Sequence, residues 1–98
     1  MYRRIRKRSN RKNVDFDLTE RWISRRFHRG LCELTKLPFD FSGNDRMMTP
    51  SFDRINPKGG YTKKNCRIIL LGLNLALQDF GLERFMVMAV ALVKECGK

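Results

Sequence analysis

The sequence predicts a small α+β domain with an N-terminal helix, a pair of strands followed by a helix, and an apolar C-terminal helix. A chain of 98 residues with 42% hydrophobic residues has the size of one small domain. Apolar residues recur at helical spacing near both ends of the chain. Between them, an alternating segment and a short apolar segment flank a glycine-containing loop, which indicates two strands.

Residues 1–13 are strongly basic. They include no acidic residue and seven cations, Arg3, Arg4, Arg6, Lys7, Arg8, Arg11 and Lys12. Because like charges in one block repel each other, the sequence predicts a flexible arm that stays extended until it meets a polyanion. We expect the arm to contact phosphates and residues 14–98 to form the folded domain.

The first helix is expected at residues 18–29. Asp17 is the expected N-cap, Glu20 follows three residues later, and Gly30 is a stop signal. One strip of this helix is basic and contains Arg21, Arg25 and Arg29, with Arg26 beside it. Because no acidic residue follows Glu20 within the helix, contact with backbone phosphates is favoured over a solvated face.

The centre of the chain is expected to form a hairpin and a helix. Residues 31–41 predict a short hairpin or an irregular stretch, and residues 42–45 a loop. Residues 51–55 alternate in polarity and predict a strand with Phe52 on one face and Asp53 exposed on the other. After a turn at residues 56–60, residues 66–69 predict a second strand and residues 70–80 a helix that Gly81 ends.

A final helix is expected at residues 82–95. Apolar residues cover most of its circumference, namely Phe85, Met86, Met88, Val90, Leu92 and Val93. Two interpretations remain open: a lid on the core of the same chain, or a homodimer through this helix.

The charge balance predicts a polyanionic partner. Twenty-one Lys and Arg against ten Asp and Glu give a net charge of +11, which favours nucleic acid or an anionic membrane. The longest apolar stretches are too short to span a bilayer, and no secretory pattern follows the basic N-terminus. We therefore expect no membrane-spanning helix and an intracellular location.

The cysteines predict neither disulfides nor zinc. Cys32, Cys66 and Cys96 lie far apart in the sequence and form no Cys-x-x-Cys pair. A zinc site would require all three and His28 to converge, so no structural zinc is expected.

Three polar residues predict a metal site in the strand, loop and helix segment. Asp53 lies on the first strand, Asn65 closes the loop, and Asn74 lies one turn into the helix. If the helix packs across the hairpin, Asp53 and Asn74 offer two oxygen ligands to one divalent ion, and such sites suit Mg²⁺ or Mn²⁺. Asn65 is expected to brace the loop.

The motifs of residues 31–80 resemble a known family. They are Cys32-Glu33-Leu34-Thr35, Leu37-Pro38-Phe39, Pro50-Ser51-Phe52-Asp53-Arg54-Ile55, Gly60-Tyr61, Asn65 and Asn74. Together they resemble the HNH endonucleases, in the branch common in phages that carries Asp-Arg-Ile. The resemblance implies a ββα-metal (His-Me finger) fold that hydrolyses phosphodiester bonds in DNA with one divalent ion, in the cytoplasm of a phage or bacterial host cell. It also implies that Asp53 and Asn74 bind the metal.

The chain departs from this family at the general base. Arg54 stands where the family has His, and Lys36 where related sequences often have Gly. Arg54 stays protonated, so it is expected to clamp a phosphate instead of accepting a proton. The base is then His28, which resembles the His of HNH-type restriction enzymes with Arg at this position, or Tyr61, or no protein group at all.

The expected DNA-binding set joins the arm, the helical strip and the loop lysines. It comprises Arg3, Arg4, Arg6, Lys7, Arg8, Arg21, Arg25, Arg29, Lys58, Lys63 and Lys64. The alternative function is a non-catalytic nucleic-acid-binding protein on a degenerate HNH scaffold. A small basic ribosome-associated protein would also fit the charge and size, but it does not account for the order of Asp53, Asn65 and Asn74.

Overall fold

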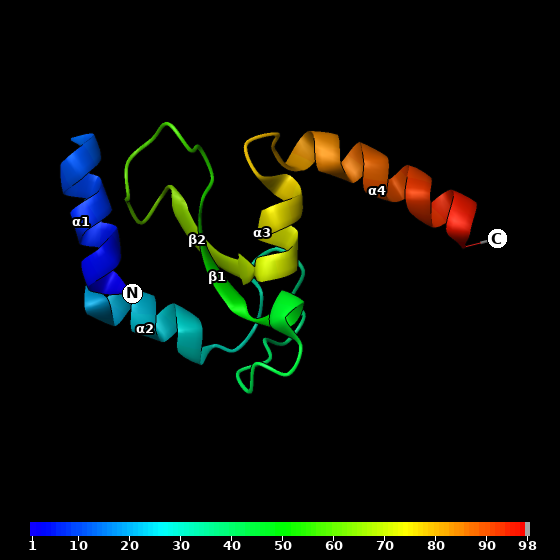
Figure 1. Cartoon of the computed structure of the whole chain (residues 1–98), viewed down its shortest axis with the longest axis horizontal. Coiled ribbons are helices and arrows are strands. Elements are labelled where there is room, and N and C mark those ends of the chain that lie inside the picture. The colour runs from blue at the N-terminus through cyan, green and yellow to red at the C-terminus, as the bar shows by residue number, and fades with distance from the viewer. Residues whose placement is uncertain (98) are drawn as a thin grey trace.

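An antiparallel strand pair lies between two helical regions in the computed structural model, which describes residues 1–97 (Figure 1). The elements are α1 (Tyr2–Lys12), α2 (Glu20–His28), the 3₁₀ turn η1 (Arg46–Met48), β1 (Pro50–Arg54), β2 (Cys66–Leu70), α3 (Leu71–Leu77) and α4 (Leu82–Cys96). The expected α+β class is confirmed. None of the helices in residues 1–97 has the length and apolar character needed to cross a membrane.

The hairpin fixes which residues face each other at the centre of the molecule. Asp53 pairs with Arg67 and Arg54 with Cys66 in the antiparallel register. The helix α3 begins directly after β2, so it folds back beside the strand pair (Figure 1). The expected strands are therefore confirmed, each with one residue more or less at its ends.

Two apolar clusters support this hairpin. One cluster contains Cys32, Phe39, Ile68, Ile69, Leu70 and Leu77, and the other contains Ile5, Leu18, Ile23, Tyr61 and Cys66. Phe52 of β1 packs against both clusters. The strand pair thus connects α3 on one side with α1 and α2 on the other.

The N-terminal segment differs from the extended arm that its charge predicts. It forms the helix α1, in which Ile5 and Ser9 are each only 2% exposed. Ile5 joins the cluster of Leu18 and Ile23, and the Ser9 hydroxyl donates to the carbonyl of Val14 at 3.2 Å. One buried face is enough to hold the helix because the cations point away from it.

The helix α2 begins later than expected because Thr19 is its N-cap. The Thr19 hydroxyl accepts a hydrogen bond from the Trp22 amide at 3.1 Å. Asp17 instead accepts from the Lys63 amide at 2.7 Å, which ties the start of α2 to the hairpin loop. The prediction of Asp17 as the N-cap was therefore wrong.

The segments around α3 also refine the expected pattern. Residues 31–41 are irregular, with a single bridge between Leu31 and Pro38. The helix α3 ends at Leu77 rather than at residue 80, because Gln78 has a φ of 41° that no α-helix continues. Asp53, expected to be exposed, has a side chain that is 12% exposed because it pairs with Arg67.

Candidate functional site

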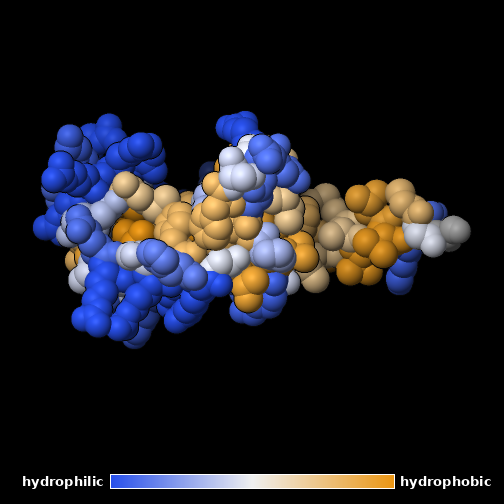
Figure 2. All heavy atoms as spheres, turned by 90° about the horizontal axis from the view of Figure 1, so that it is seen from below, coloured by the Kyte–Doolittle hydropathy of each residue, from blue (hydrophilic) through white to orange (hydrophobic). Residues whose placement is uncertain are grey.

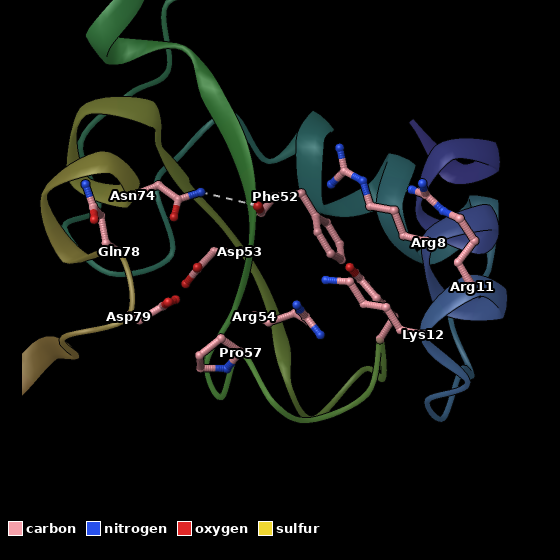
Figure 3. A pocket seen from close by; sticks show the side chains of 11 residues that line it. Arg8, Arg11, Lys12, Phe52, Asp53, Arg54, Pro57, Asn74, Gln78 and Asp79 are labelled. Carbon is pink, nitrogen blue, oxygen red and sulfur yellow. Dashed lines mark hydrogen bonds between the residues drawn. The ribbon is translucent and has the colours of Figure 1, made fainter.

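A cavity of about 380 Å³ opens beside β1, between the end of α3 and the helix α1 (Figure 3). Its lining residues come from four regions of the chain: Arg8, Arg11 and Lys12 from α1, Phe52, Asp53 and Arg54 from β1, Pro57 and Tyr61 from the loop, and Asn74, Gln78 and Asp79 from α3 and the residues after it. The structure therefore brings Asp53, Arg54, Tyr61 and Asn74 together, as the sequence predicted.

Asp53 is held by the residue opposite it in the hairpin. The Arg67 Nε donates to the Asp53 Oδ2 at 2.8 Å, and the two side chains are 15% and 12% exposed. The other carboxylate oxygen, Oδ1, makes no hydrogen bond within residues 1–97 and remains for the cavity. The cation thus keeps the carboxylate oriented and largely shielded from water.

Asn74 is oriented by the backbone and a hydroxyl of β1. Its Nδ2 donates to the Ser51 Oγ at 2.8 Å and to the Phe52 carbonyl at 3.3 Å. With both donors directed at the strand, the amide oxygen is free to face the cavity, and Figure 3 shows it on the side of Asp53. The strand β1 therefore presents a carboxylate oxygen of Asp53 to the cavity, and the helix α3 presents the amide oxygen of Asn74.

Asp79 lines the cavity, although no motif of the sequence indicates it as a site residue. It lies just after α3, where Gln78, with a φ of 41° and a ψ of −125°, ends the helix. Figure 3 shows the carboxylates of Asp53 and Asp79 pointing toward one another across the cavity. The sequence predicts a helix over residues 70–80, which places Asp79 inside the helix, whereas α3 ends at Leu77 and Asp79 follows it.

Arg54 extends over the aromatic ring of the loop. Its guanidinium lies 4.5 Å from the centroid of Tyr61, and its Nη1 donates to the Gly59 carbonyl at 2.9 Å. The Tyr61 ring is 3% exposed and stacks on Phe52 at 6.3 Å. Only part of the guanidinium is used by these contacts, so further N–H donors remain for an anion in the cavity.

Asn65 braces the hairpin loop, as expected. Its Oδ1 accepts from the Asn56 amide at 2.9 Å, and its Nδ2 donates to the carbonyls of Asn56 at 3.0 Å and Gly60 at 2.8 Å. Gly59 is required here because a Cβ at this position would lie 2.8 Å from the Asn65 Nδ2. The loop that carries Pro57 and Tyr61 is thereby fixed.

The cavity has two electrically different sides. Asp53, Asn74 and Asp79 supply oxygen atoms on the α3 side, while Arg8, Arg11 and Lys12 supply cations on the α1 side, with Arg54 between them (Figure 3). The sequence predicts Arg11 and Lys12 only as parts of an arm that contacts DNA. Their placement opposite Asp53 follows from the buried Ile5, which fixes the rotation of α1.

His28 does not reach this cavity. It lies at the end of α2 and lines a separate hollow with Phe27 and Phe41. Its Nδ1 contacts the Ser24 carbonyl at 2.7 Å and the Ser24 hydroxyl at 3.2 Å. This arrangement does not support the expectation that His28 is the general base.

A second basic surface lies on α2 and its C-cap, Arg29. Three of its residues, Arg21, Arg25 and Arg29, line one hollow together with Lys63 of the loop, beside Thr19, Trp22 and Arg26. Arg26 is ion-paired with Glu33 and stacks on Trp22 at 4.5 Å. Glu33 therefore neutralises one cation of the strip, and the other three remain with Lys63.

The other expected DNA-binding cations are on the surface. Arg4 and Lys7 line a groove on α1 with Arg8 and Arg11, and Arg6 stacks on Phe16 at 4.4 Å. The remaining ones, Arg3, Lys58 and Lys64, are exposed on α1 and on the hairpin loop.

The cysteines are distributed over three places. Cys32 and Cys66 are buried in different clusters, and Cys96 is exposed at the end of α4. Burial raises the pKa of the Cys66 thiol to about 12, so it stays protonated at neutral pH. Across residues 1–97, His, Cys, Asp and Glu side chains form no group of three or more that could hold a metal ion.

In comparisons with protein-family models, curated proteins and solved structures, none matches this chain.

Proposed function

We propose that the protein is a metal-dependent endonuclease that hydrolyses phosphodiester bonds in DNA. The observation that carries the proposal is the cavity in which Asp53 and Asn74 face the cations of α1. One half of this cavity suits a divalent ion and the other half suits the phosphates that flank the scissile bond. A nuclease that uses a metal ion needs both.

The order of the elements supports the proposal. The chain runs from β1 to β2 and directly into α3, with Asp53 on the first strand and Asn74 on the helix. This is the order of a ββα-metal unit, the HNH-type fold that the motifs of residues 31–80 resemble. Asn65 then has the place of the loop-fixing residue and makes the hydrogen bonds that such a role needs.

The donor set fits a hard cation. Asp53, Asn74 and Asp79 offer two carboxylates and an amide oxygen, and the hydrogen bonds from Asn74 to β1 direct its nitrogen away from the cavity. Oxygen ligands with remaining positions for water and phosphate suit Mg²⁺ or Mn²⁺. When bound, such an ion would stabilise the negative charge that develops on the scissile phosphate and lower the pKa of a water molecule.

The protein's own cations position the substrate. Arg54 is held by Gly59 and Tyr61, so its remaining donors are pre-oriented toward a phosphate oxygen. Arg8, Arg11 and Lys12 then bind the neighbouring phosphates along the α1 side. The second basic surface on α2 extends the path of the DNA backbone with Arg21, Arg25 and Arg29.

The proton acceptor is not a histidine in this proposal. His28 lies in another hollow, and Arg54 cannot accept a proton. The two interpretations that remain are Tyr61, which lines the cavity, and hydrolysis without a protein base. The variant Tyr61→Phe distinguishes them because it keeps the ring contacts with Phe52 and Arg54 and removes only the hydroxyl.

The second candidate function is a nucleic-acid-binding protein without catalysis. Two observations favour it: the usual base is replaced by Arg54, and Arg67 occupies one oxygen of Asp53. Both functions require DNA binding that weakens steeply with salt. They differ only in whether the phosphodiester bond is broken.

A plasmid assay separates the two functions. Supercoiled plasmid is incubated with the protein and Mg²⁺ or Mn²⁺, and a parallel reaction contains EDTA. The endonuclease converts the plasmid to the nicked or linear form only when metal is present. Intact plasmid with either metal, together with retarded migration that shows binding, would favour the non-catalytic protein.

A further inference from the structure

The helix α4 leaves the body of the molecule with its apolar side chains uncovered. None of its residues from Leu82 to Cys96 is buried, and Val87 and Val93 are 72% and 69% exposed. Figure 1 shows the helix projecting away from α3, and Figure 2 shows apolar residues over its surface. Phe85, near its start, packs against the core. So long an exposed apolar surface in a small, charged chain indicates a binding surface.

Two neighbouring stripes of α4 carry a self-complementary pattern. Their members recur at i, i+4, i+7 and i+11 and therefore lie on one side of the helix. The first stripe is apolar and consists of Leu82, Met86, Ala89 and Val93. The second stripe consists of Glu83, Val87, Val90 and Lys94. The second stripe thus has an acid at its first end, a base at its last end, and two valines between them.

We propose that α4 pairs with α4 of a second copy of this chain in antiparallel orientation through these two stripes. A two-fold axis near Ala89 then brings Glu83 level with the partner's Lys94, and the same contact repeats at the other end. The valines and Met86 pack between these two ion pairs. The opposed helix dipoles add to the antiparallel preference.

The parallel arrangement lacks this complementarity. It would place Glu83 beside the partner's Glu83 and Lys94 beside the partner's Lys94, and like charges at such positions destabilise the pair. It would also bring two chains of net charge +11 side by side. In the antiparallel pair the two bodies lie at opposite ends of helices that are about 20 Å long, which reduces this repulsion.

A second copy fits α4 better than a lipid surface does. Helices that lie on membranes carry a polar face rich in Lys and Arg. The charged residues of α4 are instead balanced, with Glu83 and Glu95 against Arg84 and Lys94. The pairing is independent of the proposed nuclease activity, because it uses no residue of the cavity.

Sedimentation equilibrium without DNA or metal tests the pairing. We expect a dimer at micromolar concentration and at least a tenfold weaker dimer for Val87→Glu, which buries a charge in the contact. Leu92→Glu is the matched control, since Leu92 is 63% exposed on the opposite side of α4 and should leave the dimer unchanged. Equal weakening by both variants, or a monomer at every micromolar concentration, would overturn the proposal.

Charge exchange tests the orientation. Glu83→Lys and Lys94→Glu should each weaken the dimer about tenfold, because each replaces two attractions by two repulsions. The double variant Glu83→Lys/Lys94→Glu restores both pairs and should return the dimer to near wild-type affinity. A parallel pair has only like-charge contacts before and after each exchange, so unchanged affinity in the single variants would contradict the antiparallel arrangement.

Monomeric protein can also be mixed with vesicles of phosphatidylcholine and phosphatidylserine and centrifuged. Sedimentation with the vesicles that is lost in both Val87→Glu and Leu92→Glu would identify α4 as a membrane-surface helix and overturn the pairing. We expect both variants to sediment with these vesicles as the wild type does, through the basic body alone.

Discussion

Arg67 and Asp53 face each other across the hairpin and share a hydrogen bond of 2.8 Å between Nε and Oδ2. The pair couples the stability of the β1–β2 hairpin to the orientation of the proposed metal ligand. Because both side chains are largely shielded from water, the attraction between the two charges is screened less than in an exposed ion pair. Removal of either partner is costly, since it leaves the other charge shielded from water and unpaired.

Replacement of Arg67 by Met should destabilise the protein and make it more dependent on metal. We expect a decrease of about 1–2 kcal/mol in the free energy of unfolding, because the Asp53 carboxylate is left without its partner. Saturating Mn²⁺ should recover more stability in Arg67→Met than in the wild type, since the ion replaces the missing cation beside Asp53. Thermal unfolding with Mn²⁺ and with EDTA measures both effects. Equal stabilisation of the two proteins by Mn²⁺ would contradict a metal site at Asp53.

Asp79 should contribute to metal affinity although it is not part of the strand and helix motif. We expect Asp79→Asn to raise the Mn²⁺ concentration for half-maximal binding about tenfold, because it removes one of two carboxylates from the cavity. Asp45→Asn is the matched control, since it makes the same charge change on the exposed loop before η1. An unchanged Mn²⁺ titration for Asp79→Asn would remove Asp79 from the ligand set.

The helix α1 should be required for both folding and DNA binding. We expect Ile5→Ala to lower the free energy of unfolding by about 2–3 kcal/mol, because Ile5 is 2% exposed in the cluster with Leu18. Arg11→Gln and Lys12→Gln should keep the fold and reduce the slope of log K against log salt by about 0.9 for each phosphate that the variant no longer binds. Urea unfolding and DNA binding at several salt concentrations test the two roles. If the double variant Arg11→Gln/Lys12→Gln kept the salt slope of the wild type, these two cations would lie outside the DNA interface.

Deletion of residues 1–13 provides a further check on α1. If residues 1–13 were an extended arm, their deletion would leave the free energy of unfolding unchanged. Because they form a packed helix, we expect the deletion to lower it. Unaltered urea unfolding after the deletion would therefore restore the view of the segment as a passive arm.

The buried thiol of Cys66 should make the protein less stable at high pH. Its pKa is raised by burial from an ordinary value of 9.0 to about 12, so the folded state holds the proton more tightly than the unfolded state does. This contribution is complete below pH 9 and disappears as the pH rises from 9 toward 12, by at most about 1.4 kcal/mol per pH unit. Urea unfolding of the wild type and Cys66→Ala at pH 8 and pH 10 isolates it. A parallel decline of the two proteins would contradict the raised pKa.

The hairpin and the site residues on it could be predicted because they depend on local patterns. Alternation around Phe52 and Asp53, the glycine turn and the apolar second strand each specify a strand or a turn within a few residues. Once the two strands pair and α3 follows directly, Asp53 and Asn74 must lie near each other. The sequence order alone therefore predicted the centre of the cavity.

The helix α1, the end of α3 and the position of His28 could not be predicted, because they depend on tertiary contacts that no local pattern contains. Charge repulsion predicts an extended N-terminus, but burial of Ile5 against Leu18 and Ile23 outweighs it and turns the basic segment into a helix. Likewise, the positive φ of Gln78 ends α3 early, and Asp79, the next residue, lines the cavity. The chemistry of His28 makes it a candidate base, and only the rotation of α2 places it in another hollow.

A comparison of two variants in the plasmid assay tests most directly whether phosphodiester hydrolysis takes place at Asp53. With Mg²⁺ or Mn²⁺ present, Asp53→Ala should abolish cleavage while the protein still binds DNA at least as tightly as the wild type, because the change removes a metal ligand and a negative charge from a surface that faces phosphate. His28→Ala should retain a rate within about twofold of the wild type, since His28 lies outside the cavity. Cleavage by a folded Asp53→Ala protein, or its absence in a folded His28→Ala protein, would contradict this assignment of the site.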